Sequence, residues 1–516
     1  MQLDFNFNLF HDDAKIELGL QDFLKNIEIP TSFLAHYKLE ILNEKKSKIQ
    51  YKIISDCLNK LPLNTINKLV QYFKEIPNLD YLLSNIDNQS LDQIQLKQLG
   101  DFCILDQKVS ELENSFPLKK SIQHQKILSI LNQYLQDDFS YFSKSEQIDL
   151  LKLEMDNLNQ NFQNAISNYE KNILIDTKIK LYYPYKKEIP YEKNLLSQLS
   201  QSKFISVSQK DNLIVIDYIL PKDIQNLQSK RKNLLKKYQT LIQNKLIEIN
   251  SKLSPYLSKF NNYIQLKKYR LYIYALCLFS HKSNLCIPTF QNKFILFNNA
   301  RLFSLEQNTK NYKPLNLSTK SGASILFGAN MTGKTSVLKT LYFHFCLMQL
   351  AIPLPATKIE CFYPTNILLK LKNSGSIQKK MSSFSEEIQF WTQDFQKHSV
   401  ILCDELFLNT EPSAGEIISK IVIDYIKTKN VFFMASSHYI NLFELNDVNL
   451  FYMKSLINKN NLDKHKLLEQ IPFELAPIKK DDKMCLQTMK NEALELALCF
   501  DLPSEIKNKI TNILKG

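Results

Sequence analysis

The stretch LFGANMTGKTSVLK, residues 326–339, holds two of the eight glycines in this 516-residue chain. Gly328 and Gly333 stand five residues apart, and Lys334 and Thr335 follow at once, which satisfies the pattern G-x-x-x-x-G-K-[ST]. A strand-like run, SILF, precedes the pattern, and apolar residues at helical spacing follow it. In such a context the glycines permit a tight turn whose N–H groups converge on phosphate oxygens at a helix N-terminus. The stretch therefore predicts a phosphate-binding loop within an α/β fold.

The loop residues have distinct chemical roles. Lys334 can neutralise the charge of β- and γ-phosphates, and the Thr335 hydroxyl can ligate Mg²⁺. The backbone of the remaining positions is expected to surround the phosphates. These nucleotide-binding candidates are Gly328, Ala329, Asn330, Met331, Thr332, Gly333 and Ser336.

A second motif is the run VILCDE, residues 400–405, an apolar strand that ends in two carboxylates. This pattern is typical of a Walker B strand, in which Asp404 would hold the Mg²⁺ shell and Glu405 would polarise the attacking water. An ordinary strand with acidic residues at its end is the alternative. The position of the run downstream of the phosphate loop favours the catalytic interpretation.

Further short apolar runs alternate with helical patterns after about residue 281, which predicts a mostly parallel sheet covered on both faces. His438 follows one of these runs, and ligands bind at the carboxyl ends of such strands. On the residues alone, a structural role for His438 stays open. The runs are SILF (324–327), NILLKL (366–371), SVILCDE (399–405) and VFFMASSH (431–438).

Residues 1–280 show long helical spacing instead. Two series, around 141–172 and 224–264, have apolar residues at three- and four-residue steps, and Pro255 is expected to kink the second. The segment between them, about 173–221, is β-branched, aromatic and punctuated by prolines, which predicts short strands at the tip of two antiparallel helices. The expected domains are a helical core and lever at 1–280, an α/β domain at 281–480 and a helical tail at 481–516.

Composition narrows the class of protein. Apolar residues make up 44% and charged residues 23% of the chain, which is ordinary for a folded soluble protein. The absence of a long apolar run and of a secretory signal predicts no membrane partner. Nine cysteines occur without any C-x-x-C pair, which predicts reduced thiols, no zinc and a cytoplasmic location.

The net charge of +13 is concentrated in one segment. Residues 222–270 contain 12 Lys and Arg against Asp223 and Glu248. Such a segment is typical of sequence-independent contact with DNA phosphates, although a solvated helix face in a lysine-rich protein is the alternative. The candidate DNA contacts are Lys230, Arg231, Lys232, Lys236 and Lys237.

Taken together, these motifs resemble the MutS family of the ABC ATPase superfamily. The resemblance is carried by GANMTGKT (328–335), SSFSEEI (382–388), Asp404-Glu405 and SSHY (436–439), with weaker likeness in PLNL (314–317) and IPNLDYLLSNI (76–86). It implies an α-helical core and lever with a small clamp tip, followed by a P-loop ATPase domain.

The resemblance also implies a mechanism. ATP and Mg²⁺ would be the cofactors, Lys334 and Glu405 would act in hydrolysis, and His438 would correspond to the family's switch histidine. Ser382 would complete the ATP site of the opposite subunit, so a homodimer or a heterodimer is expected. Tyr312 is a candidate for stacking on the adenine.

Several departures from the family pattern bear on the process served. The mismatch-reading and connector domains have no room, no nuclease-type tail follows residue 480, and LFLNTEPSAG (406–415) replaces a Gly-rich turn. We expect an ATP-gated clamp on double-stranded or branched DNA, acting in DNA repair (mismatch repair included) or recombination rather than in simple mismatch reading. The alternatives are the ATPase subunit of a reactivating factor for a cobalamin-dependent aminomutase, with a protein client and no DNA role, and a slow ATPase that serves as a scaffold.

Overall fold

The structure is a computed structural model, and the chain in it divides into two compact units. The first comprises residues 1–74, 112–117 and 267–516, and the second comprises 75–111 and 118–266. The residues that the structure describes are 19–27, 40–86, 90–113, 123–136, 139, 142, 146–308, 312–329, 332–371, 383–393, 395–454, 474–479, 491, 494–495, 497–498 and 502–515.

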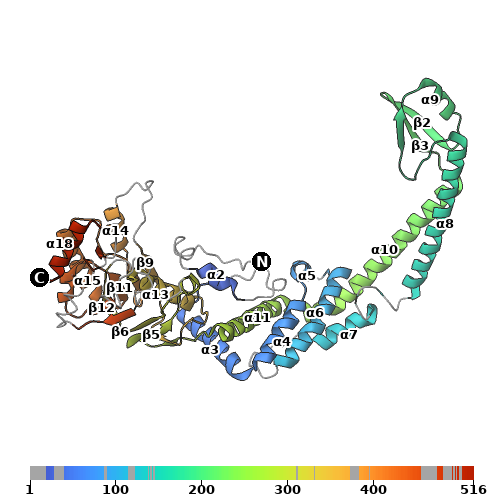
Figure 1. Ribbon diagram of the computed structural model, residues 1–516. Helices are drawn as coiled ribbons and strands as arrows, with labels where there is room; N and C mark the ends of the chain where they lie inside the picture. The colour runs from blue at the N-terminus through green and yellow to red at the C-terminus, as the bar shows by residue number, and fades with distance from the viewer. Residues whose placement is uncertain are drawn as a thin grey trace. The chain divides into compact units, whose positions relative to one another are not determined.

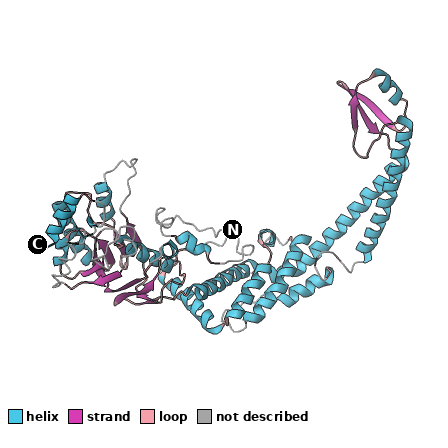
Figure 2. Ribbon diagram, viewed as in Figure 1, coloured by secondary structure: helices cyan, strands magenta, loops and turns pink. Residues whose placement is uncertain are grey.

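A six-stranded sheet forms the centre of the first unit (Figure 2). Its order is β13-β12-β7-β11-β10-β9, and all neighbouring pairs are parallel except β12 with β13. The four predicted runs correspond to four of these strands, so the prediction of a mostly parallel sheet is confirmed. The strands are β7 (Gly322–Phe327), β9 (Ile367–Lys370), β10 (Val400–Cys403), β11 (Phe432–Ser436), β12 (Asn449–Lys454) and β13 (Glu474–Pro477).

Helices cover both faces of this sheet. Successive strand residues point to opposite faces. On one face, Phe433 shares a buried cluster with Ile423 of α15 (Pro412–Lys427). On the other face, Phe432 packs near Phe345 of α13 (Lys334–Gln349), with the two ring centroids 6.1 Å apart. The sheet is therefore buried on both sides, which explains why its strands read as continuous apolar runs.

The first unit also contains a four-stranded sheet that the sequence analysis did not predict. Its order is β4-β8-β5-β6, and exposure alternates along β5, as expected of a half-buried strand. The strands are β4 (Thr289–Phe290), β5 (Phe294–Ala300), β6 (Leu315–Lys320) and β8 (Lys358–Cys361). Further elements with residues in this unit are α2 (Leu20–Lys25), α3 (Glu44–Lys60), α4 (Leu63–Glu75), α11 (Phe260–Ser283), α12 (Phe303–Asn308), α14 (Ser383–Trp391), η3 (Ile440–Glu444) and α18 (Ser504–Lys515).

In the second unit two long helices, α8 (Glu146–Thr177) and α10 (Lys222–Leu257), run side by side (Figure 1). The chain between them forms an antiparallel sheet in the order β1-β3-β2 and one short helix. Phe162, Ile166 and Tyr169 of α8 are buried in a cluster with this sheet. The elements are β1 (Lys187–Pro190), α9 (Lys193–Leu199), β2 (Ile205–Lys210) and β3 (Leu213–Tyr218), with α5 (Asp80–Ile86), α6 (Gln93–Leu112) and α7 (His124–Tyr134) elsewhere in the unit.

The apolar series around 224–264 is two helices rather than one kinked helix. α10 ends at Leu257, two residues after Pro255, and α11 begins at Phe260. A proline within a helix removes one backbone hydrogen bond and its ring crowds the preceding turn, so an end close by is physically reasonable. Within the described part of the chain, no helix combines the length and the apolar composition that crossing a bilayer requires.

Candidate nucleotide site

The loop between β7 and α13 has the backbone that its glycines predict. Gly328 and Gly333 have φ values of +146° and +102°, in the region that side chains disfavour. A Cβ at Gly328 would lie 2.9 Å from the hydroxyl of Thr332. That hydroxyl donates a hydrogen bond of 2.7 Å to the carbonyl of Ala329. Thr332 is thus hydrogen-bonded to Ala329 and fills the space that a Cβ at Gly328 would need.

Lys334 begins α13 and directs its ammonium group back toward the loop. Its Nζ donates to the carbonyl oxygen of Gly328 at 2.7 Å and to that of Ala329 at 3.2 Å. The side chain is buried, with 5% of the residue exposed. These two contacts keep the ammonium group beside the backbone of the loop itself. Lys334 is therefore placed to contact a phosphate at the loop.

Two predicted metal ligands lie in contact. Thr335 Oγ1 donates to Asp404 Oδ2 at 2.7 Å, although the two residues are 69 positions apart. The other carboxylate oxygen, Asp404 Oδ1, accepts a hydrogen bond of 2.6 Å from the hydroxyl of Ser436. The structure thus brings a hydroxyl and a carboxylate together at the carboxyl end of the sheet, where ligands of such folds bind.

Ser436 is a site residue for which the sequence analysis gave no role of its own. Its hydroxyl donates to Asp404 and also accepts the backbone N–H of Glu405 at 2.8 Å. β10 and β11 pair in parallel with Cys403 opposite Ala435, so Ser436 lies beside Asp404. The motif SSHY is visible in the sequence, but the strand register that brings Ser436 next to Asp404 is not.

Glu405 and His438 lie close together at the same end of the sheet. His438 Nε2 is 3.4 Å from Glu405 Oε1, and the Glu405 side chain is 10% exposed. Glu405 has a φ value of +55°, in the left-handed region that is costly for a residue with a side chain. Such strain is typical of functional sites, where it sets the direction of a side chain.

The start of helix α15 explains the sequence of the segment LFLNTEPSAG. Glu411 caps α15 by accepting the backbone N–H groups of Ser413 at 3.1 Å and Ala414 at 2.9 Å, and Pro412 occupies the first turn. A Cβ at Gly415 would lie 2.2 Å from the hydroxyl oxygen of Tyr439. A well-capped helix therefore stands where the family pattern has a Gly-rich turn.

The remaining nucleotide candidates are only partly placed. Asn330, Met331 and Ser382 lie outside the described residues. Ser336 lies in the first turn of α13. Tyr312 precedes β6 and its hydroxyl oxygen accepts the N–H of Leu302 at 2.6 Å, while burial raises the pKa of Tyr312 to about 12. Stacking of Tyr312 on an adenine stays a prediction.

The basic segment 222–270 separates into an exposed part and a buried part. Lys267, Lys268 and Arg270 are at most 7% exposed, and Glu113 pairs with Lys267 at 3.0 Å and with Arg270 at 2.6 Å. These three cations therefore do not belong to a solvent-facing patch. All five candidate DNA contacts are exposed on α10: Lys230, Arg231, Lys232, Lys236 and Lys237.

The five exposed cations do not share one orientation. At 100° per residue, Arg231 faces the same side of α10 as the buried residues, and its guanidinium lies over the Phe162 ring of α8 at 5.5 Å. The four lysines are distributed around the other sides of the helix. These four lysines are exposed to solvent and could meet a polyanion.

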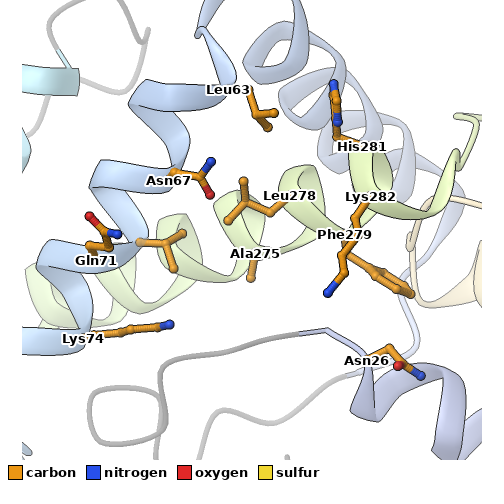
Figure 3. Close-up of a pocket in the computed structure, with 11 residues that line it drawn as sticks. Asn26, Leu63, Asn67, Gln71, Lys74, Ala275, Leu278, Phe279, His281 and Lys282 are labelled. Carbon is orange, nitrogen blue, oxygen red and sulfur yellow. The ribbon is translucent and has the colours of Figure 1, made fainter.

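A separate cavity of about 380 Å³ lies between α4 and α11 (Figure 3). It contains none of the loop, acidic-strand or histidine residues described above, so it is distinct from the candidate nucleotide site. Three basic side chains, those of Lys74, His281 and Lys282, line it, and no acidic side chain does. The lining residues are Asn26, Leu63, Asn67, Val70, Gln71, Lys74, Ala275, Leu278, Phe279, His281 and Lys282.

Comparisons with known proteins show what this chain is similar to. The chain is similar to endonuclease MutS2 of Borreliella burgdorferi, with 20% identity over 423 residues, which are 80% of this chain and 49% of that protein. It is also similar to endonuclease MutS2 of Lactiplantibacillus plantarum, with 28% identity over 204 residues (38% and 26%), and of Staphylococcus saprophyticus, with 32% over 124 residues (23% and 16%). The matched part thus spans about half the length of the first relative and less of the others.

A family model covers the part of the chain that carries the candidate site. Residues 324–510 match MutS domain V. This range begins within β7 and includes the phosphate loop, the acidic strand β10 and the histidine that follows β11. The part of the chain that carries the candidate site is therefore similar to MutS domain V, and the chain is similar to MutS2 proteins.

Proposed function

We propose that this protein is a MutS-like ATPase that converts ATP and water to ADP and phosphate and acts on DNA. The observation that carries the proposal is the contact of Thr335 with Asp404 at 2.7 Å, directly after a phosphate loop whose Lys334 is buried. The likeness to MutS domain V and to MutS2 proteins supports it. Each of these residues has the functional group that its role requires.

The chain's own residues would act in sequence around the nucleotide. The amide groups of the loop and Lys334 bind the phosphates. Glu405 accepts a proton from the attacking water, or polarises it, and His438 at 3.4 Å from Glu405 senses the γ-phosphate. The strained backbone of Glu405 keeps its carboxylate directed toward the position of that water.

The donor set suits Mg²⁺ that arrives with the nucleotide. Thr335 and Asp404 offer a hydroxyl and a carboxylate oxygen, and Mg²⁺ in such sites is held by one or two protein oxygens together with substrate phosphates. Within the residues that the structure describes, no group of three or more His, Cys, Asp or Glu side chains could form a complete metal cage. When bound, the ion would neutralise charge that develops on the phosphates.

Replacing Thr335 by alanine tests this assignment. Addition of Mg²⁺ should raise the nucleotide affinity of the wild-type chain. In the variant this rise in affinity should be about 10- to 100-fold smaller, because one oxygen ligand is missing. Binding of a fluorescent ATP analogue, titrated with and without Mg²⁺, measures the effect. Thr340→Ala is a matched control on the same helix, since its hydroxyl bonds only the Ser336 carbonyl within the described residues. Equal Mg²⁺ dependence in both variants would contradict the assignment.

The rest of the proposal concerns the assembly. The helical part, about 1–280, would be the core and lever, and the sheet between α8 and α10 would be the clamp tip. The chain would act as a homodimer or heterodimer in which Ser382 reaches the ATP site of the other subunit. ATP binding would then close the clamp on double-stranded or branched DNA. The exposed lysines of α10 support the DNA part of this proposal.

A further inference from the structure

The turn that carries Glu405 is supported through three successive backbone N–H groups. Ser436 accepts two of them, with its hydroxyl oxygen from Glu405 at 2.8 Å and with its carbonyl from Leu406 at 3.2 Å. The third, of Phe407, is accepted by Glu387 Oε1 at 2.9 Å. Glu387 belongs to α14, a separate helix in the sequence. A side chain from outside the acidic-strand motif VILCDE, within the segment SSFSEEI (382–388), thus completes the support of the turn.

The turn needs this support because its backbone is strained. Glu405 and Phe407 have φ values of +55° and +47°, and neither is glycine. Such conformations persist when surrounding contacts hold them in place. The hydrogen bond from Phe407 to Glu387 is one of these contacts, so its loss would allow the turn to relax.

Lys370 makes Glu387 a stronger support. The Glu387 carboxylate is buried, with 3% of the residue exposed, and Lys370 Nζ lies 3.1 Å from the oxygen that binds the Phe407 N–H. The carbonyl of Lys370 also accepts the N–H of Asp404 at 2.8 Å. Hydrogen bonds to an ionised carboxylate are stronger than neutral ones. Lys370 thus contacts both sides of Glu405, with its side chain through Glu387 and with its backbone carbonyl at Asp404.

Two aromatic residues, Trp391 and Tyr439, hold Phe407 in the same turn. The rings of Phe407 and Trp391 of α14 are stacked, with centroids 6.4 Å apart and planes at 28°. The hydroxyl of Tyr439 donates to the Phe407 carbonyl at 2.8 Å, and Gly415 leaves room for Tyr439. Phe407 is held by its ring, its N–H and its carbonyl, so a change at Glu387 acts on a well-defined position.

We propose that Glu387, neutralised by Lys370, is a positioning residue for ATP hydrolysis. It acts through the backbone: it fixes the Phe407 N–H and thereby the direction of the Glu405 carboxylate. The inference rests on the proposed ATPase function. A displacement of a reacting group by about 1 Å can cost about 10²-fold in rate. Removing Glu387 should therefore slow the chemical step while the phosphate loop still binds ATP.

Steady-state hydrolysis and ATP binding by Glu387→Ala and Glu387→Gln in the full chain test the proposal. Glu387→Ala should lower kcat by about 30- to 100-fold and leave ATP affinity within about twofold of wild type. Glu387→Gln keeps an oxygen acceptor for the Phe407 N–H but loses the charge, so a loss of about 3- to 10-fold is expected. If the alanine variant does not fold, the nearly isosteric glutamine variant still decides the question.

Glu416→Ala is the matched control. Glu416 lies on α15, and within the described residues its carboxylate pairs with Lys420 at 2.8 Å and accepts hydrogen bonds from Asn441 rather than from the N–H groups of the turn. Its variant should keep the wild-type kcat. A kcat within about twofold of wild type for the Glu387 variants, or an equal fall of kcat and ATP affinity, would overturn the inference. A wild-type chain without hydrolysis would overturn the proposed function, and this inference with it.

Discussion

Replacing Glu405 by glutamine should lower the rate of ATP hydrolysis by about 10²- to 10⁴-fold and leave ATP bound to the protein. The substitution removes the carboxylate that accepts the proton of water but preserves the size of the side chain. The loop, Lys334 and the pair Thr335–Asp404 are untouched, so binding should continue. The turn should also persist, because Ser436 bonds the backbone N–H of residue 405 and not its side chain.

Two measurements on the same sample check this expectation. Phosphate release under saturating ATP gives the rate, and retention of radiolabelled ATP after rapid gel filtration gives the trapped fraction. Glu416→Gln, a paired carboxylate on α15, is the control and should match the wild type. Hydrolysis by Glu405→Gln at the wild-type rate would show that another group activates the water.

Neutralising the exposed lysines of α10 should produce the second large effect, on DNA binding. The variant replaces Lys230, Lys232, Lys236 and Lys237 by glutamine. Each phosphate contact contributes about 0.9 to the slope of log affinity against log salt, so the slope should become shallower by about 3 to 4. Between about 50 and about 200 mM salt, the wild-type affinity should therefore fall about 10²-fold more than that of the variant.

A salt series with linear and branched duplexes measures both slopes. A control variant with the same loss of charge, Lys45, Lys46, Lys52 and Lys60 to glutamine on α3, separates a local contact from the effect of net charge. The control should keep the wild-type slope. Equal slopes for the wild type and the α10 variant would contradict the assignment of DNA contacts to α10, and absence of binding at low salt would contradict the DNA part of the proposed function.

The sequence predicted the parallel sheet well because buried strands have a strong signal. β7, β10 and β11 are covered on both faces, so nearly every residue in them is apolar. The sheet containing β5 and β6 was not predicted, because an alternating strand such as FILFNNA gives a weak sequence signal in a chain rich in helical patterns. Helix ends were also less predictable, as the break between Leu257 and Phe260 shows.

The candidate site was predictable where a motif fixes both residue type and position. Lys334, Thr335 and Asp404 lie together as their spacing suggests. The hydrogen bonds that Ser436 makes to Asp404 and that Glu387 makes to the turn depend on strand register and on the packing of a separate helix. A single sequence does not reveal either of these.

The number of basic residues in the segment 222–270 overstates its exposed charge, because a count of residues takes no account of burial. Lys267 and Arg270 raise the charge of the basic segment in the sequence. In the folded chain both residues, which lie on α11, are buried against Glu113, so the exposed charge of the segment comes from lysines on the preceding helix, α10.

The central claim is that the loop after β7 and the acidic end of β10 form one ATPase site. The most direct measurement is phosphate release from ATP by the wild-type chain and by Lys334→Ala, each with Mg²⁺ and with a chelator. The account predicts saturable release by the wild type that requires Mg²⁺ and falls by at least about 10²-fold in the variant, because the buried cation that meets the phosphates is gone. Equal release by both proteins, or no release from the wild type with Mg²⁺, would contradict it.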